Sequence, residues 1–166
     1  MRRPTPIVPD QGQESVWDYP RPPRVEPVTA VIRIVLAGEV IALTNKAYRV
    51  LETSHPPTYY LPPGDIAPDA LHPSRSRPTV CEWKGIALTF DVRGGGELMR
   101  DGAWAYPRPS AGYEEIADHV AFYCSLMDEC WVGDVMAAPQ PGHFYGGWVT
   151  PDVVGPFKGV PGSHSW

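Results

Sequence analysis

The sequence predicts a mainly β fold, in which short antiparallel strands are joined by long loops rich in proline and glycine. The chain holds 21 proline and 16 glycine residues among 166, and neither residue type is tolerated well inside a helix. Helix bundles and α/β folds with repeated long helices are therefore disfavoured. A hydrophobic content of 43%, with 11% aromatic residues, is still sufficient for a core. We expect one compact domain built from short strands and turns.

The chain is predicted to divide into three parts. Residues 1–23 hold few apolar side chains and end in YPRPPR, which is typical of a flexible, proline-rich arm. Within this arm, the two aromatic side chains of VWDY at 16–19 are able to dock onto the domain. Residues 24–138 are expected to form the β domain. Residues 139–166 contain five prolines and six glycines but also several aromatic side chains, so we expect them to wrap around the same domain.

Alternating apolar residues predict the strands of the first half of the domain. VIRIVL at 31–36 and VIAL at 40–43 are separated by Ala-Gly-Glu, which indicates an antiparallel hairpin. A further strand is expected over 47–52, and two prolines separate it from a short strand over 58–61. Residues 62–78 contain five prolines and are expected to be mostly loop.

The second half begins with two apolar runs at 80–83 and 86–93, and in the second run the apolar residues alternate on one face. Three glycines at 94–96 then connect to a strand over 97–100, which is the clearest hairpin signal in the chain. A further strand is expected over 103–106, where two nearby prolines end it.

One short helix is predicted over residues 112–119. Glu114 and Glu115 favour its first turn, and Ile116 with Val120 provides a small apolar stripe. Residues 120–127 are open between a continued helix and a strand. We favour a strand, because 120–123 is β-branched and aromatic, and we expect it to pair with 130–132.

The global composition excludes several functional classes. The formal charge is −5 with only 14 scattered lysine and arginine residues, which argues against a nucleic-acid surface. No run of 18 apolar residues and no apolar leader is present, so we expect neither a membrane span nor a secretory signal, and a cytoplasmic location. Three cysteines without CxxC spacing and histidines without HxxxH spacing predict no metal site.

Two aromatic residues near acidic residues form the first candidate binding group. Tyr59 and Tyr60 lie on a predicted strand, so their side chains point to opposite faces and only one of them is able to line a pocket. The carboxylate of Glu52 or Asp65 would accompany it. The alternative is that one tyrosine is core and the other lies at its rim.

A second group combines Cys81, Lys84 and Gly85 with the aromatic residues Trp104 and Tyr106. A nearby cation favours a thiolate, but strand alternation places Cys81 and Lys84 on opposite faces, which counts against a simple nucleophile. Lys84 beside the flexible Gly85 is a better candidate for holding an anionic ligand. Trp104 and Tyr106 share one strand face and form either core or the wall of a cleft.

The blocks YYLPPGD, CEWKG and AWAYP, in this order, resemble a known family. It is domain-of-unknown-function family 427, which is also named a nucleotidyltransferase family, and the resemblance covers about residues 24–166. It implies two antiparallel sheets set at a steep angle, similar to the β-tent architecture. The residues that match the family's motif positions are Glu52, Tyr60, Pro62, Asp65, Cys81, Lys84, Gly85, Trp104, Tyr106 and Pro107.

Three functions follow as hypotheses. The first is a small-molecule-binding domain, with or without catalytic activity, whose ligand and cofactor the sequence does not identify. The second is a nucleotide-processing enzyme in which Glu52 and Asp65 hold Mg²⁺. The third is an interaction module whose YPRPPR run binds a partner or a second copy in a homodimer.

Overall fold

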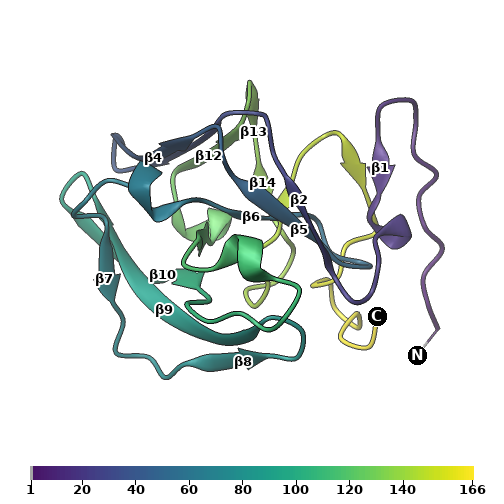
Figure 1. Ribbon diagram of the computed structural model, residues 1–166. Coiled ribbons are helices and arrows are strands. Elements are labelled where there is room, and N and C mark those ends of the chain that lie inside the picture. The colour runs from purple at the N-terminus through teal and green to yellow at the C-terminus, as the bar shows by residue number, and fades with distance from the viewer. Residues whose placement is uncertain (1) are drawn as a thin grey trace.

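The computed structural model, which describes residues 2–166, consists of three larger β-sheets and two pairs of short strands (Figure 1). The predicted mainly β fold is confirmed, but the strands divide among three larger sheets and not two. A single β-bridge between Leu61 and Val120 links two of these larger sheets, the first and the third in the order described next. The steep angle expected between sheets stays a prediction.

Every larger sheet is antiparallel, and each combines strands from distant parts of the chain. The first sheet has the order β2 (Arg24–Pro27), β5 (Tyr48–Leu51), β6 (Thr58–Tyr60). The second has the order β13 (Val135–Met136), β12 (Glu129–Val132), β3 (Ile32–Leu36), β4 (Glu39–Thr44). The third has the order β11 (Val120–Phe122), β10 (Glu97–Ala105), β9 (Gly85–Gly94), β7 (Leu71–Pro73), and β8 (Thr79–Cys81) also pairs with β9.

Four short strands and four single 3₁₀ turns complete the fold. The strand pairs are β1 (Glu14–Ser15) with β16 (Val153–Val154), which are parallel, and β14 (Ala138–Pro139) with β15 (Trp148–Val149). The turns are η1 (Val16–Asp18), η2 (Pro63–Asp65), η3 (Glu114–Ile116) and η4 (Cys124–Leu126). No helix among residues 2–166 has the length and apolar character needed to cross a membrane.

Both predicted hairpins are present, as β3–β4 and β9–β10. Their turns contact each other, because the Gly95 amide donates to the Glu39 carboxylate at 2.7 Å. Gly95 has φ of +54°, and a Cβ there would collide with the backbone of Ala37. The two strands expected over 97–100 and 103–106 are one strand, β10, with an irregularity between Met99 and Ala103.

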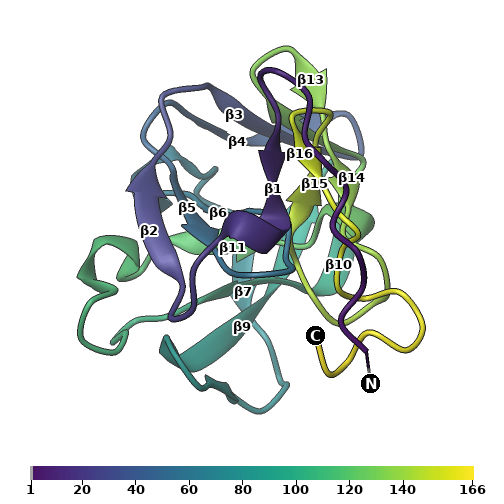
Figure 2. The ribbon, with the colours of Figure 1, turned by 90° about the vertical axis from the view of Figure 1, so that its right-hand side faces the viewer.

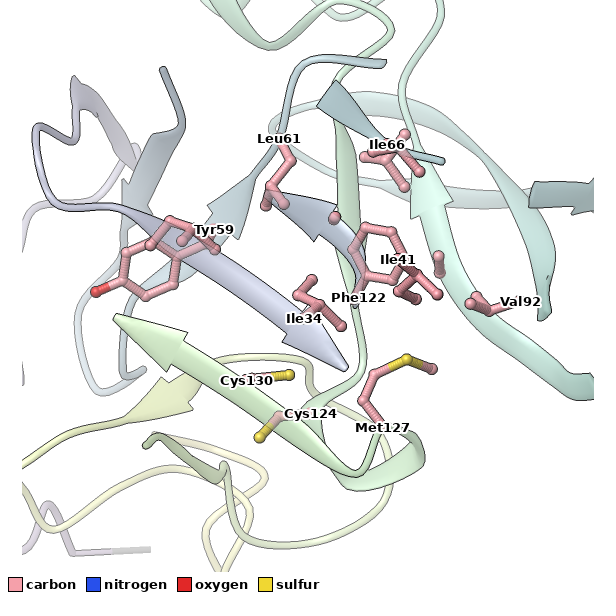
Figure 3. Close-up of a cluster of buried hydrophobic side chains, with 14 of the residues drawn as sticks. Ile34, Ile41, Tyr59, Leu61, Ile66, Val92, Phe122, Cys124, Met127 and Cys130 are labelled. Carbon is pink, nitrogen blue, oxygen red and sulfur yellow. The ribbon is translucent and has the colours of Figure 1, made fainter. Parts of the chain in front are cut away.

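The main core lies between the second and third sheets. Figure 3 shows Ile34, Ile41, Phe122 and Val92 within one cluster of buried side chains. Trp148 joins this cluster fully buried, and its indole N–H donates to the Phe122 carbonyl at 3.1 Å. The C-terminal segment that carries Trp148 is therefore part of the core.

The predicted helix over 112–119 is wrong. The segment contains only the three-residue turn η3, and the part of the chain that the structure describes contains no α-helix. Tyr113 makes no side-chain capping bond, and Asp118 has φ of +59°, which ends any helical path. Burial of a single apolar side chain, Ile116, does not compensate for these losses.

The strand preferred for 120–123 is present as β11, but the predicted partner is wrong. β11 pairs with β10, whereas β12 pairs with β3. All three residues of β11 are buried, which fits a strand covered on both faces better than one with an exposed face.

The segment before residue 24 lies against the domain over residues 14–19. Val16, Trp17 and Tyr19 are buried together with Leu51 and Val153. Figure 2 shows β1, in purple, beside β16 near the other end of the chain. The Trp17 indole N–H donates to the Pro156 carbonyl at 2.9 Å, so the two terminal segments hold each other in place.

Candidate functional site

A cleft of about 430 Å³ opens between β5, the β8–β9 hairpin, β10 and the loop that precedes β15. A second buried cluster, which includes Val50, Tyr60 and Ala87, lies beneath it. Val50 and Ala87 also line the cleft, as do Glu52, His55 and Thr89. The size is in the range of roughly 300–1,000 Å³ that is typical of small-molecule sites.

Aromatic side chains form one wall of the cleft. Trp104 and Tyr106 are two residues apart at the end of β10, so alternation directs both to the same side. Tyr123 packs against Trp104 with ring centroids 4.6 Å apart. Tyr60 lies behind this wall, 6.4 Å from Trp104 and 6.3 Å from Tyr106 between ring centroids.

The two adjacent tyrosines of β6 do point to opposite faces. Tyr60 belongs to the cluster under the cleft, while Tyr59 lies in the main core with its ring 4.9 Å from that of Trp148. Burial raises the pKa of Tyr60, and burial likewise raises the pKa of Tyr106. Both phenols are therefore protonated at neutral pH and are able to donate a hydrogen bond.

Lys84 occupies the turn between β8 and β9 and lines the cleft. Its carbonyl accepts from the Ser110 amide at 2.9 Å, and its ammonium lies 5.8 Å from the centroid of the Tyr106 ring. The next residue, Gly85, has φ of +107°, and a Cβ there would lie 3.3 Å from the Ser110 hydroxyl. A glycine is thus needed to turn the chain and aim Lys84 at the cleft.

The charge of Lys84 is maintained by its surroundings. Burial alone lowers the pKa of an ammonium group, but nearby Tyr60, Cys81 and Glu52 more than offset this and raise the pKa of Lys84. No carboxylate oxygen in residues 2–166 lies within 4.0 Å of its ammonium. Lys84 is therefore a partly buried cation without an ion-pair partner in the described chain.

Cys81 and Lys84 approach each other, contrary to the alternation argument. Alternation would require a strand that continues through residue 84, but β8 ends at Cys81 and the chain then turns. The turn brings the Lys84 ammonium back to the side of Cys81, where their interaction contributes to the raised pKa of Lys84. Cys81 is partly exposed and lines the cleft.

Glu52 and His55 form the polar end of the cleft. The Glu52 Oε2 atom is 3.4 Å from His55 Nε2 and 3.5 Å from Arg21 Nε. Burial tends to raise the pKa of Glu52, but His55, Lys84 and Arg21 outweigh it and hold the pKa below its ordinary value. Glu52 is accordingly a carboxylate at neutral pH.

A sequence model of the family described as "Domain of unknown function (DUF427)" matches residues 24–133. The chain belongs to the DUF427 family. A comparison with curated proteins finds no match. The matched range of the DUF427 domain includes Glu52, Lys84 and Trp104, whereas the cleft residues Gln140 and Lys158 lie beyond it.

The structure brings most of the expected site residues of the DUF427 domain together. The cleft is lined by Glu52, Cys81, Lys84, Trp104 and Tyr106. Tyr60 supports the aromatic wall from behind, and Gly85 shapes the turn of Lys84.

Asp65 does not line this cleft of the DUF427 domain. It is exposed in η2 and accepts a hydrogen bond from the Thr44 hydroxyl at 2.7 Å. The expected pairing of Glu52 and Asp65 around a magnesium ion is thus absent from the cleft. Within residues 2–166, no three or more His, Cys, Asp or Glu side chains cluster as metal ligands would.

Sequence reasoning missed His55 and Gln140 as site residues of the DUF427 domain. His55 follows Glu52 by three residues, a spacing that allows contact only where the chain turns after β5. Gln140 comes from the C-terminal segment, 85 residues later, and no local pattern marks it. Only the folded chain places the two side chains together.

Proposed function

We propose that the cleft binds a small organic anion with a flat, unsaturated body. The observation that carries this proposal is the Lys84 ammonium, which is charged, partly buried and without an ion-pair partner in the described chain. Removing an ammonium from water without a compensating partner is unfavourable. A carboxylate or a similar anionic group on a ligand would supply that partner.

The walls of the cleft suit the remainder of such a ligand. Trp104, Tyr106 and Tyr123 present aromatic rings on one side, and Phe144 and Tyr145 present rings from the loop before β15. Aromatic side chains favour stacked or edge-to-face contacts with other flat groups. Ligand sites generally combine such apolar walls with a few directing polar groups.

Isothermal titration calorimetry with 3-phenylpropionate and its neutral amide tests the role of Lys84. We expect the anion to bind the wild-type chain more tightly than the amide. Lys84→Met should reduce anion binding about tenfold, a loss of about 1.4 kcal/mol, without a matching effect on the amide. Lys46→Met, which removes an exposed lysine between β4 and β5 that does not line the cleft, is the matched control and should bind as wild type does.

Two outcomes would contradict the proposal. One is equal binding of the anion and the amide by the wild-type chain. The other is equal loss of anion binding in the Lys84 and Lys46 variants, which would mean a general charge effect. Unfolding curves of both variants show whether the folded state is retained before binding is compared.

A further inference from the structure

The carboxylate of Glu52 also lines the cleft, and the proposed anion site at Lys84 does not use it. Its Oε2 atom faces both His55 and Arg21, at 3.4 and 3.5 Å. In the described chain, both ionic partners of Glu52 approach it on the Oε2 side and neither is paired with the other oxygen, Oε1. The Glu52 side chain retains 21% exposure and lines the cleft. One carboxylate oxygen is thus held by the protein, and the other remains able to accept a hydrogen bond from a ligand.

The orientation of His55 is determined by Gln140. The Gln140 Oε1 atom accepts from the Gly147 amide at 3.0 Å, and its Nε2 atom donates to the Lys158 carbonyl at 2.9 Å. These two contacts assign the oxygen and the nitrogen of the side-chain amide. Because Nε2 of Gln140 is a donor, His55 Nδ1, 3.0 Å away, must accept from it.

A histidine that accepts at Nδ1 carries its proton at Nε2. In His55 this is the nitrogen that faces Glu52 Oε2 at 3.4 Å, so the Nε2–H group lies on the side of the carboxylate. The ring is packed edge-on against Tyr145, with centroids 4.8 Å apart. Glu52 is therefore held in place by a buried amide and an oriented imidazole, an arrangement that positions a carboxylate for recognition.

The cleft is lined by a cation and an anion that do not neutralise each other directly. Glu52 and Lys84 influence each other's pKa, but they do not form an ion pair. The other lysine at the cleft, Lys158, already donates to the Trp166 carbonyl at 3.1 Å. Glu82 also lines the cleft but is exposed, so Lys84 and Glu52 are the partly buried cation and anion available to a ligand with charges of both signs.

We propose that the cleft recognises a zwitterion, namely an amino acid or a related amine-bearing carboxylic acid. Lys84 binds its carboxylate, and Oε1 of Glu52 accepts from its ammonium group. This inference rests on the proposed anion site at Lys84 and adds the second point of recognition. It also assigns His55 and Gln140 as positioning residues, which hold Glu52 without contacting the ligand's ammonium group.

A matched series of ligands on the wild-type chain tests the inference by calorimetry. L-phenylalanine carries both charges, 3-phenylpropionate lacks the ammonium, and N-acetyl-phenylalanine replaces the ammonium with a neutral amide. We expect phenylalanine to bind about tenfold more tightly than 3-phenylpropionate, equivalent to about 1.4 kcal/mol. N-acetylation should abolish that gain. These comparisons need no substitution and do not depend on the folding of any variant.

Glu52→Gln then assigns the gain to one residue. In this variant, phenylalanine should lose its advantage, while the affinity for 3-phenylpropionate should change by less than about twofold, or 0.4 kcal/mol. Glu97→Gln is the matched control, because Glu97 is exposed at the start of β10. Gln140→Leu should reduce the phenylalanine advantage in part, since it releases His55 but leaves the carboxylate in the cleft.

The outcomes separate the two proposals. Lys84-dependent binding of 3-phenylpropionate with no gain from the amino group overturns the zwitterion inference and leaves the anion site intact. A gain that persists unchanged in Glu52→Gln also overturns the role of Glu52. Absence of binding by every member of the series counts against both proposals.

Discussion

Replacing Gly146 with alanine should disturb the aromatic wall of the cleft. A Cβ at this position would collide with Cη2 of Trp104 and lie 2.8 Å from its Cζ3 and 3.2 Å from its Cζ2. Carbon atoms in normal contact are about 3.5–4.0 Å apart, so the indole or the loop must move by more than about 1 Å. Because the φ of Gly146 is outside the left-handed region, the effect is steric and does not arise from backbone strain.

The expected cost follows from overpacking, which destabilises cores by about 1–3 kcal/mol. With an m-value of about 2 kcal/mol/M in urea, the unfolding midpoint of Gly146→Ala should fall by about 0.5–1.5 M. Urea titration followed by tryptophan fluorescence measures this, and calorimetry with 3-phenylpropionate should show weaker binding in the same variant.

Gly64→Ala is the matched control, because a Cβ at Gly64 would meet no atom within 4 Å and its φ is also unexceptional. A midpoint for Gly146→Ala within about 0.2 M of the control would refute the reasoning. In that case the loop before β15 would move without loss of stability, and it would not hold Trp104 in place.

Three further predictions concern the polar end, the N-terminal segment and the Lys84 turn. The pKa of Glu52 is lowered in the folded state by His55, Lys84 and Arg21 against the effect of burial. Its contribution to stability is present above its ordinary pKa of 4.5 and is lost as pH falls through the lower folded value. Urea unfolding at pH 7 and pH 3 should therefore show a smaller loss of stability in Glu52→Gln than in wild type, and an equal loss would contradict this. Trp17→Ala should speed proteolysis within residues 1–23, because Trp17 is 7% exposed; Val8→Ala, at an 84% exposed residue, should leave the rate unchanged. Gly85→Ala should lower the free energy of unfolding in urea by about 1 kcal/mol or more, since alanine disfavours the positive φ at this position. A loss equal to that of Gly64→Ala would contradict the assigned turn.

Local patterns predicted most strands, because alternation and turn residues act over a few positions. VIRIVL with VIAL, and the three glycines at 94–96, identified both hairpins. The pairing of β12 with β3 joins segments about a hundred residues apart, and alternation carries no information on such partners. The expected helix over 112–119 failed because acidic residues favour a first turn but do not supply the packing that sustains a helix.

The candidate site was predicted where its residues lie on adjacent strands. Trp104 and Tyr106 share a strand face, and the opposed directions of Tyr59 and Tyr60 follow from β alternation. The meeting of Cys81 and Lys84 was not predictable, because it depends on where β8 ends. Gln140 could not be found either, since its role depends on the path of a segment that crosses from β12 to β15.

The parallel pairing of β1 with β16 changes what counts as the smallest complete unit of this protein. The family match spans residues 24–133, yet one wall of the cleft comes from Gln140 to Lys158. That wall is anchored by β16 and Pro156, which in turn are held by β1 and Trp17. A chain cut to the matched range would keep Glu52, Lys84 and β10, but it would lose this wall and the terminal segments that hold it in place. The unit on which binding must be measured is therefore longer than the family domain at both of its ends.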